Sequence, residues 1–385
     1  MHLVGSLALA VSVLALAAPA RTASSLEPGT LAVAVIRPSS GYFAAHNLLI
    51  ARGAAIAVGQ LNKTGGIGGK IKIKLVTARL GSDQDPGRLI ASLPSTIRAV
   101  ILPCNVDATL ALAKAAAKRG LLSLAPCNPD PLSTRQLPLF VPVAMSGNEE
   151  AAQLVGYPAT RWGSKTALIL TSKPAPAYEA AMVRYLRRAA PHFGVRIIGT
   201  DTVSLGEGNL GGLAAKLRKS SADVIFTPIF SPYAEAIIAK LRKAGVLKPV
   251  LATDGMDAQL DLEHYAGIAL KDVSFASFGF PRDSSKAFFK AYKKAFHRVP
   301  IGSFPSLGLE TIRTLAAGVG QAQSAEPAAI DAAFTKGLSV SGVGLAERRY
   351  PGGAREPIAD VAIVDLISGS YFPSMSSIAT RVPAP

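Results

Sequence analysis

Residues 31–76 combine a strand, a helix and a second strand, and this pattern restricts the fold more than any other stretch of the chain. Residues 31–36 are apolar and rich in β-branched side chains, which predicts a buried strand. From Ala44 to Leu61 the apolar residues recur at helical spacing, and Gly65 and Gly66 then stop the helix, because glycine adopts a left-handed helix end at little cost. Residues 71–76 alternate as a strand does, so the chain begins with a β-α-β unit.

The same alternation continues through most of the chain. It predicts parallel sheets with right-handed crossovers, and 385 residues suit two lobes better than one domain. The further strands are predicted at 99–102, 121–125, 140–143, 166–170, 195–198, 223–226, 250–253 and 361–364. The further helices are predicted at 108–118, 178–189, 210–219, 234–244, 284–297 and 306–321.

A group of short motifs gives the pattern a family. They are Gly41, Arg52-Gly53-Ala54, Leu61-Asn62, the glycine turn 65–70, and residues 82–86. Together they resemble the type I periplasmic binding proteins, and most closely the branched-chain amino acid and amide receptors of ABC importers. The resemblance implies an α/β fold of two Rossmann-like lobes joined by a hinge of about three crossings. It implies that lobe 1 comprises 29–143 plus 277–340, and lobe 2 comprises 144–276 plus 341–376.

The N-terminus predicts export. Residues 3–18 form an uncharged apolar run that is too short for an ordinary membrane span and typical of a signal-peptide core. Small residues at 18–20 and 21–23 suit cleavage, so we expect residues 1–23 to be a signal peptide and the mature protein to be periplasmic. We expect no membrane-spanning helix elsewhere.

The formal net charge of +16 could indicate nucleic acid, an acidic membrane or another anionic partner, or simply a solvated surface. The basic residues are spread along the chain without interleaved aromatic residues, which favours the solvated surface and no nucleic-acid partner. The chain has no G-x-S-x-G or H-E-x-x-H motif, and its glycine turn lacks the Ser or Thr of a phosphate-binding loop. We therefore expect no enzymatic activity, cofactor or metal.

In parallel sheets the loops that follow the strands carry the binding residues. We expect a cleft between two such sets of loops. The candidate ligand-binding residues are Ser40, His46, Asn105, Val106, Cys127 and Asn128 on lobe 1, and Tyr178, Phe230 and Asp254 on lobe 2.

The resemblance gives roles to four of these residues. It places Tyr178 and Phe230 as aromatic contacts and Asp254 as the partner of a ligand ammonium, while His46 stands where the family often has Tyr or Phe. Each has an alternative role: Asp254 could form a tight turn with Gly255, Tyr178 and Phe230 could be packing residues, and His46 could be a solvated loop residue.

The chain departs from the family at several binding positions. Val106 stands at a family Ser, Gly308 replaces a frequent Tyr, and Pro129 has no N–H to donate. The compatible ligands are therefore an amino acid, an amide, an aromatic acid or an amine.

The two cysteines, Cys104 and Cys127, each follow a proline and precede an asparagine, after neighbouring predicted strands. Three interpretations are open. They form a disulfide, they remain buried thiols, or they bind a metal together with His46.

Taken together, these observations predict a solute receptor of an ABC importer, which closes its lobes around a small polar or amphipathic ligand. Its partner would be an inner-membrane permease, and we expect a monomer. The alternatives are a sensory or accessory binding protein that is not coupled to transport, and an enzyme that uses the cleft.

Overall fold

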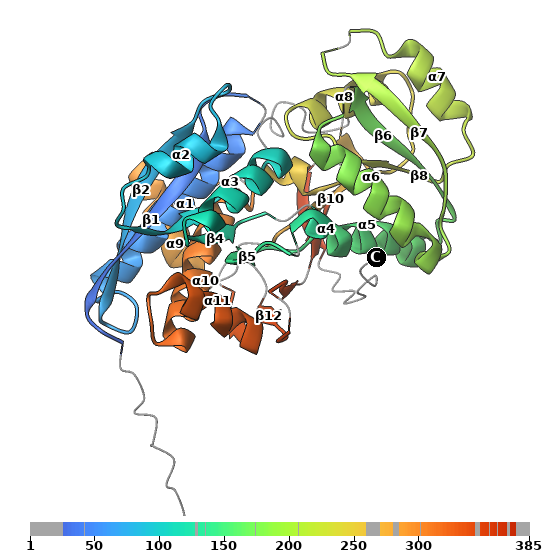
Figure 1. The fold of residues 1–385 in the computed structure, drawn as a ribbon. Helices are drawn as coiled ribbons and strands as arrows, with labels where there is room; N and C mark the ends of the chain where they lie inside the picture. The colour runs from blue at the N-terminus through green and yellow to red at the C-terminus, as the bar shows by residue number, and fades with distance from the viewer. Residues whose placement is uncertain are drawn as a thin grey trace, which may run out of the picture.

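The computed structural model has two α/β lobes (Figure 1). It describes residues 26–41, 43–127, 130–134, 136–173, 175–206, 208–258, 270–279, 285–300, 302–342, 347–353, 355–359, 361–367 and 370–374. The expected signal peptide and Asn128 lie outside the described residues. Among the described residues, no helix is long and apolar enough to cross a membrane.

The sheet of lobe 1 has five parallel strands in the order β2-β1-β3-β4-β5. Its strands are β1 (Gly29–Pro38), β2 (Ile71–Leu80), β3 (Ile97–Ile101), β4 (Leu122–Ala125) and β5 (Phe140–Pro142). Its helices are α1 (Ala44–Lys63), α2 (Pro86–Ser92), α3 (Val106–Lys118), α4 (Pro131–Thr134), α9 (Lys286–Phe296), α10 (Phe304–Ala322) and α11 (Pro327–Lys336).

Strand β1 lies inside this sheet and is buried on both faces, as its continuous apolar run predicts. Leu31 and Val33 pack in the core beneath α1, α10 and α11, whereas Ala32 and Ala34 pack in the core beneath α2 and α3. Strand β2 is at the sheet edge, where Lys72 and Lys74 point outward and discourage pairing with another chain.

Helices α1 and α10 cross at unusually short range because each carries a glycine at the contact. A Cβ on Gly53 would lie 1.8 Å from the Pro305 carbonyl oxygen, and one on Gly308 would lie 2.0 Å from the Ile50 carbonyl oxygen. Gly308 therefore has a packing reason for its departure from the family, since a larger side chain would force the helices apart.

Within the described residues, the sheet of lobe 2 has seven strands in the order β15-β14-β10-β9-β8-β6-β7, and β14 pairs antiparallel with both of its neighbours, β10 and β15. Its strands are β6 (Thr166–Lys173), β7 (Arg196–Ser204), β8 (Val224–Thr227), β9 (Val250–Ala252), β10 (Val273–Ser277), β14 (Ala362–Ile367) and β15 (Ser370–Ser374). Its helices are α5 (Gly147–Trp162), α6 (Ala177–Ala189), α7 (Gly211–Lys219), α8 (Tyr233–Lys243) and the short 3-10 helices η1 (Ala190–Phe193) and η2 (Asp254–Ala258).

The chain passes between the two sheets three times, from β5 to α5, from β10 to α9, and into β14. One expected boundary is wrong. Residues 341–359 were assigned to lobe 2, yet strands β11 (Leu338–Val340), β12 (Arg348–Tyr350) and β13 (Ile358–Ala359) form a small antiparallel sheet beside lobe 1. Tyr350 belongs to the core of lobe 1, and its hydroxyl donates to the Pro142 carbonyl at 2.8 Å. We therefore propose that lobe 2 takes its last segment from β14 onward.

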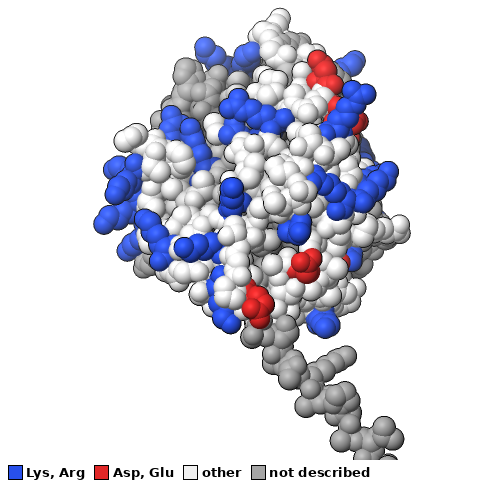
Figure 2. Space-filling view, turned by 60° about the vertical axis from the view of Figure 1, so that its left-hand side comes forward, with Lys and Arg blue, Asp and Glu red and all other residues white. Residues whose placement is uncertain are grey.

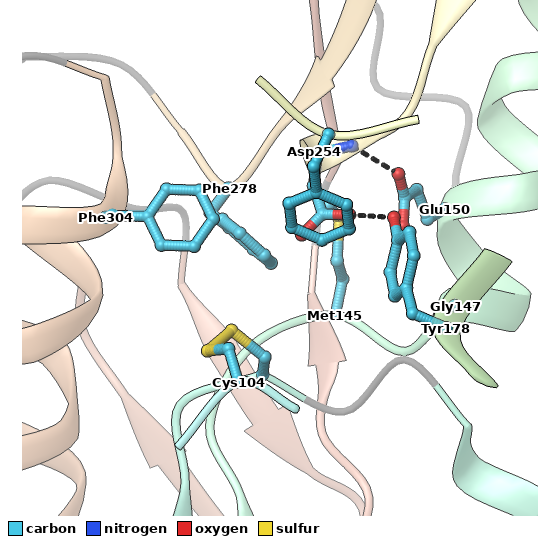
Figure 3. A pocket seen from close by; sticks show the side chains of 10 residues that line it. Cys104, Met145, Gly147, Glu150, Tyr178, Asp254, Phe278 and Phe304 are labelled. Carbon is cyan, nitrogen blue, oxygen red and sulfur yellow. Dashed lines mark hydrogen bonds between the residues drawn. A yellow bond between two sulfur atoms is a disulfide. The ribbon is translucent and has the colours of Figure 1, made fainter. Parts of the chain in front are cut away.

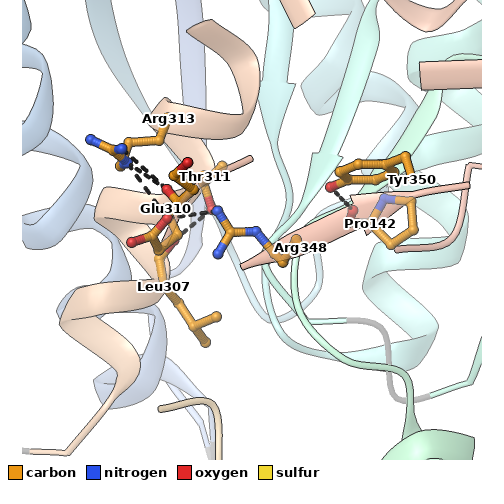
Figure 4. A network of polar contacts seen from close by, with 8 residues as sticks. Pro142, Leu307, Glu310, Thr311, Arg313, Arg348 and Tyr350 are labelled. Atoms are coloured by element: carbon orange, nitrogen blue, oxygen red, sulfur yellow. Dashed lines mark hydrogen bonds and ion pairs between the residues drawn. The ribbon is translucent and has the colours of Figure 1, made fainter. Parts of the chain in front are cut away.

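A buried ion pair explains why β12 stays with lobe 1 (Figure 4). Arg348 donates to the Glu310 carboxylate of α10 at 2.6 Å, and both side chains are almost completely buried. Arg313 lies 3.8 Å from the same carboxylate. Removing one member of a buried pair leaves an uncompensated charge, so this contact fixes β12 to α10.

Basic side chains are spread over the lobe 1 face in Figure 2, with few acidic residues among them. Lys72 and Lys74 of the edge strand are exposed, as are Lys63 at the end of α1 and Lys293 and Lys294 of α9. This distribution agrees with the prediction of dispersed charge along the chain.

Candidate functional site

A pocket lies between the lobes, at the carboxyl ends of the parallel strands (Figure 3). Its walls come from both lobes and from the segments that connect them. The polar side is formed by Glu150 of α5, Tyr178 of α6 and Asp254 of η2, with Gly147 beside them. The apolar side is formed by Cys104, Cys127, Met145, Phe230, Phe278 and Phe304.

The two cysteines form a disulfide, which is the first of the three interpretations. Strands β3 and β4 are neighbours in the sheet, and the residues that follow them bring the two Cα atoms to 5.3 Å. The Asn47 side chain fixes one of these ends, because its oxygen accepts the N–H of Cys104 at 2.9 Å. No group of three metal-binding side chains occurs among the described residues.

The polar wall is a chain of three ionisable groups. The Tyr178 hydroxyl donates to Oδ1 of Asp254, and the backbone N–H of Asp254 donates to Oε1 of Glu150 at 2.7 Å. Each side chain is at most 5% exposed. Asp254 occupies the start of η2 directly after β9, while Glu150 and Tyr178 occupy the first turns of α5 and α6.

Burial raises the pKa of all three groups. It raises the pKa of Asp254 to about 6, although hydrogen bonds from Tyr178 and Glu150 act in the opposite direction. Burial, together with the negative charge of Asp254, raises the pKa of Glu150 well above its usual value, and the same two causes raise the pKa of Tyr178. The two carboxyls therefore hold their protons to a higher pH than exposed carboxyls do.

Aromatic rings from both lobes meet beside this polar wall. Phe230 of lobe 2 makes edge contacts with Tyr178 at 4.5 Å, with Phe43 at 5.0 Å and with His46 at 5.2 Å between ring centroids. His46 is fully buried and also contacts Phe304 at 5.1 Å. Such edge contacts are the favoured geometry of aromatic clusters and bury much apolar surface.

The lobes are closed over the pocket. The space between the lining side chains has room for about one water molecule. Outside the pocket, Asp130 of lobe 1 is buried and accepts hydrogen bonds from two residues of α6 in lobe 2. The Tyr185 hydroxyl lies 2.6 Å from its carboxylate, and the Arg184 guanidinium lies 3.1 Å from it. A ligand larger than water therefore needs the lobes to separate before it can enter.

The structure brings Tyr178, Phe230, Asp254 and Cys127 together at the pocket. His46 lies behind the lining, against the rings of Phe230 and Phe304, rather than in a solvated loop.

Three other candidates lie outside the lining set. Asn105 is the N-cap of α3, where its side chain accepts the N–H of Ala108 at 3.0 Å, and Val106 is half-buried at the start of that helix. Ser40 is exposed after β1.

Sequence reasoning missed Glu150, Met145, Phe278 and Phe304. Glu150 had a usable signal, because Ser146 and Glu149 form a capping box that begins α5. That pattern would have placed Glu150 in the first turn of a helix that directly follows the first crossing. Phe278 follows β10 at the second crossing, and Phe304 begins α10 of lobe 1.

A family model described as periplasmic binding protein matches residues 30–370. The chain belongs to the periplasmic binding protein family. A Leu/Ile/Val-binding protein of Rhizobium johnstonii is 22% identical over 310 residues, which cover 79% of this chain and 82% of that protein. A Leu/Ile/Val/Thr-binding protein of Salmonella typhimurium is 24% identical over 321 residues, which cover 81% of this chain and 84% of that protein.

Solved structures of periplasmic binding proteins have the same fold. The branched-chain amino acid transporter substrate-binding protein of Streptococcus pneumoniae, solved with isoleucine, matches with a TM-score of 0.77 at 19% identity, covering 90% of this chain and 99% of its own. A solute-binding protein of R. palustris, solved with benzoate, matches with a TM-score of 0.73 at 18% identity, covering 92% of this chain and 100% of its own.

The predicted fold class and the resemblance to branched-chain amino acid receptors are confirmed. The family is one of solute-binding proteins rather than enzymes.

Proposed function

We propose that this protein is the solute receptor of an ABC importer, and that it binds a small polar or amphipathic molecule between its lobes. The supporting observation is the pocket itself, where a hydrogen-bonded polar wall on lobe 2 faces an apolar wall to which lobe 1 contributes a disulfide. Relatives that bind Leu, Ile and Val, or that belong to transporters, support the same reading.

The arrangement suggests how binding is coupled to a change of shape. With the lobes apart, a ligand meets Asp254, Tyr178 and Glu150 on lobe 2. Closure about the three crossings brings the lobe 1 wall onto the apolar part of the ligand and excludes water, which strengthens each polar contact. The contacts of Asp130 with Tyr185 and Arg184 then add to the stability of the closed form.

The closed form would be the one that an inner-membrane permease recognises, because only in it do both lobes present a fixed joint surface. We propose that the protein acts as a monomer in the periplasm after removal of residues 1–23. We take the candidate residues Tyr178, Phe230, Asp254 and Cys127 to contact the ligand directly, and His46 to support Phe230 from behind.

Solution scattering on the mature protein tests the coupling. Addition of a saturating ligand, selected from a panel of amino acids, amides, aromatic acids and amines, should reduce the radius of gyration and raise Tm. The Asp254→Asn variant should need far more ligand for the same change. An exposed aspartate at the opposite end of the lobe 2 sheet provides the matched control, and Asp272→Asn should behave as the wild type. Binding by no member of the panel would contradict the proposal.

Transport is tested separately in cells. A strain that lacks the gene should lose uptake of the radiolabelled ligand, and the wild-type gene should restore uptake where the Asp254→Asn gene does not. Unchanged uptake despite tight binding in vitro would instead favour the alternative of a sensory or accessory binding protein.

A further inference from the structure

The charge distribution in the pocket restricts which part of a ligand can bind where. The polar wall consists of two carboxyl groups and a phenol that are hydrogen-bonded to each other. Among the described lining residues none is lysine or arginine, and the rest of the lining is aromatic, thioether or disulfide apart from Gly147. An anionic group placed here would face Asp254 and Glu150 without a compensating cation, which is costly in a site that excludes water.

A helix N-terminus could in principle supply the missing positive field, and α5 begins at the pocket with Gly147. This end is already compensated. Glu149 and Glu150 both lie in its first turn, and the Ser146 side chain accepts the N–H of Glu149. The start of α5 therefore adds negative charge to the pocket instead of a site for a carboxylate.

Among the described lining residues, the opposite wall has no second polar side chain either. The disulfide joins the two loop ends that lobe 1 contributes to the pocket, and a disulfide neither donates a strong hydrogen bond nor carries charge. Phe278 and Phe304 extend this wall, and their rings lie in edge contact at 5.7 Å. The pocket thus has one acidic end and one apolar end.

We propose that the ligand is an amine without a carboxylate, whose ammonium binds Asp254, Glu150 and Tyr178 while its hydrocarbon part lies against Phe278, Phe304 and the disulfide. This inference rests on the proposed function and specifies its ligand class. Ammonium groups are strong donors to carboxylates, and aromatic faces attract cations as well as apolar groups.

Proton exchange gives the proposal a second readout. Burial raises the pKa of both carboxyls, and the negative charge of Asp254 raises the pKa of Glu150 further. Tyr178 of α6 also contacts Asp254. Two further ionisable side chains are engaged elsewhere: His46 of α1 contacts the Phe230 ring, and Asp257 of η2 accepts a hydrogen bond from Ser277 at 2.7 Å. An arriving ammonium favours the ionised carboxyls, so binding releases to the buffer any proton that they hold.

Matched ligands test the class directly. Isothermal titration of the mature protein with isopentylamine and leucine, and with 2-phenylethylamine and phenylalanine, compares each amine with the amino acid that adds only an α-carboxylate. We expect each amine to bind at least about tenfold more tightly than its partner, and benzoate not to bind. If an amino acid or benzoate binds more tightly than the amines, the inference is wrong and the proposed function stands. If no solute of any class binds, both are wrong.

Variants and buffers locate the contact. Asp254→Asn should weaken amine binding by at least about 30-fold, and Tyr178→Phe by a smaller factor, whereas Asp272→Asn should leave it unchanged. At pH 7 the binding enthalpy of the wild type should vary with the ionisation enthalpy of the buffer, which reports proton release. Glu150→Gln should reduce that release. Amine binding that is insensitive to both Asp254→Asn and Tyr178→Phe would overturn the proposal even if those variants fold normally.

Discussion

The two lobes contribute chemically opposite walls to one pocket. Lobe 2 provides Asp254 and Tyr178, which are joined by a hydrogen bond, and Glu150 of α5, which accepts the backbone N–H of Asp254. Lobe 1 provides the disulfide and, behind the lining, the rings of Phe43 and His46. Under the proposed function, the two lobes have different roles. Lobe 2 orients the polar end of the ligand, and lobe 1 covers its apolar part when the lobes close.

The largest effect on stability should come from removing the disulfide of lobe 1. The Cys104→Ala, Cys127→Ala variant loses a cross-link between residues separated by 23 positions, so we expect the free energy of unfolding to fall by about 3 kcal/mol. Denaturant titration measures the change. Reduction of the wild type with dithiothreitol should give a loss of similar size, and a variant as stable as the wild type would contradict the structural role of the disulfide.

The next largest effect is the pH-dependent contribution of Asp254, in the polar wall of lobe 2, to the free energy of unfolding. The folded-state pKa of Asp254 is raised to about 6, above the value of an unfolded aspartate, so the stability it contributes is fully present below about pH 4 and is lost as the pH rises through 6. Relative to the Asp254→Asn variant, the free energy of unfolding of the ligand-free wild type should fall by on the order of 2 kcal/mol between pH 4 and pH 8. Thermal and denaturant unfolding of both proteins across this pH range separates the contribution of Asp254 from that of other titrating groups.

A cationic ligand should reverse the sign of this dependence, because it stabilises the ionised carboxyls. The ligand-induced rise in Tm should therefore increase from pH 5 to pH 8. A rise in Tm that shrinks over this range would show that the ligand prefers the protonated pair, and it would remove the proposed distinction between an ionic wall and an apolar wall.

The smallest effect should come from the contact that joins the two lobes outside the pocket. Tyr185→Phe removes a hydroxyl that donates to the buried Asp130 carboxylate at 2.6 Å, so we expect closure to lose about 1.5 kcal/mol and ligand affinity to fall about tenfold. Arg184→Gln should matter less, because that side chain is 55% exposed and its ion pair is screened. Equal effects of the two variants would contradict this ranking.

Most helices and strands of lobe 1 could be predicted from the sequence because their hydrophobic patterns are local. The helix at 44–61 and the strands around it have clear periodicity and glycine ends, and α1 begins at Ala44 as expected. Helix α5 was missed for a physical reason. Every residue from Gly147 to Pro158 except Glu149 is buried, so the helix has little polar face to reveal its period.

The remaining misses depend on contacts between distant residues. The boundary at 341 failed because the ion pair that holds β12 on lobe 1 joins Glu310 to Arg348, which are 38 positions apart. His46 was expected at the ligand because of its family position, and its ring packs against Phe230 and Phe304 behind the pocket lining, a contact between distant residues that spacing does not reveal. Tyr178, Phe230 and Asp254 were predicted to lie at the cleft because they follow or begin elements at the carboxyl edge of the lobe 2 sheet, and they line the pocket, while their contact with a ligand stays a prediction.

The close crossing of α1 and α10 has a consequence for selectivity. Phe304 is the first residue of α10, and Phe43 and His46 lie at the start of α1, so these rings are mounted on two helices that Gly53 and Gly308 lock together. Rings held on two locked helices cannot move apart to fit ligands of different size. The range of ligand sizes that the protein tolerates would then be set by how far the two lobes close. Relatives with bulkier residues at this helix crossing should hold their lobes at a different separation in the ligand-bound form.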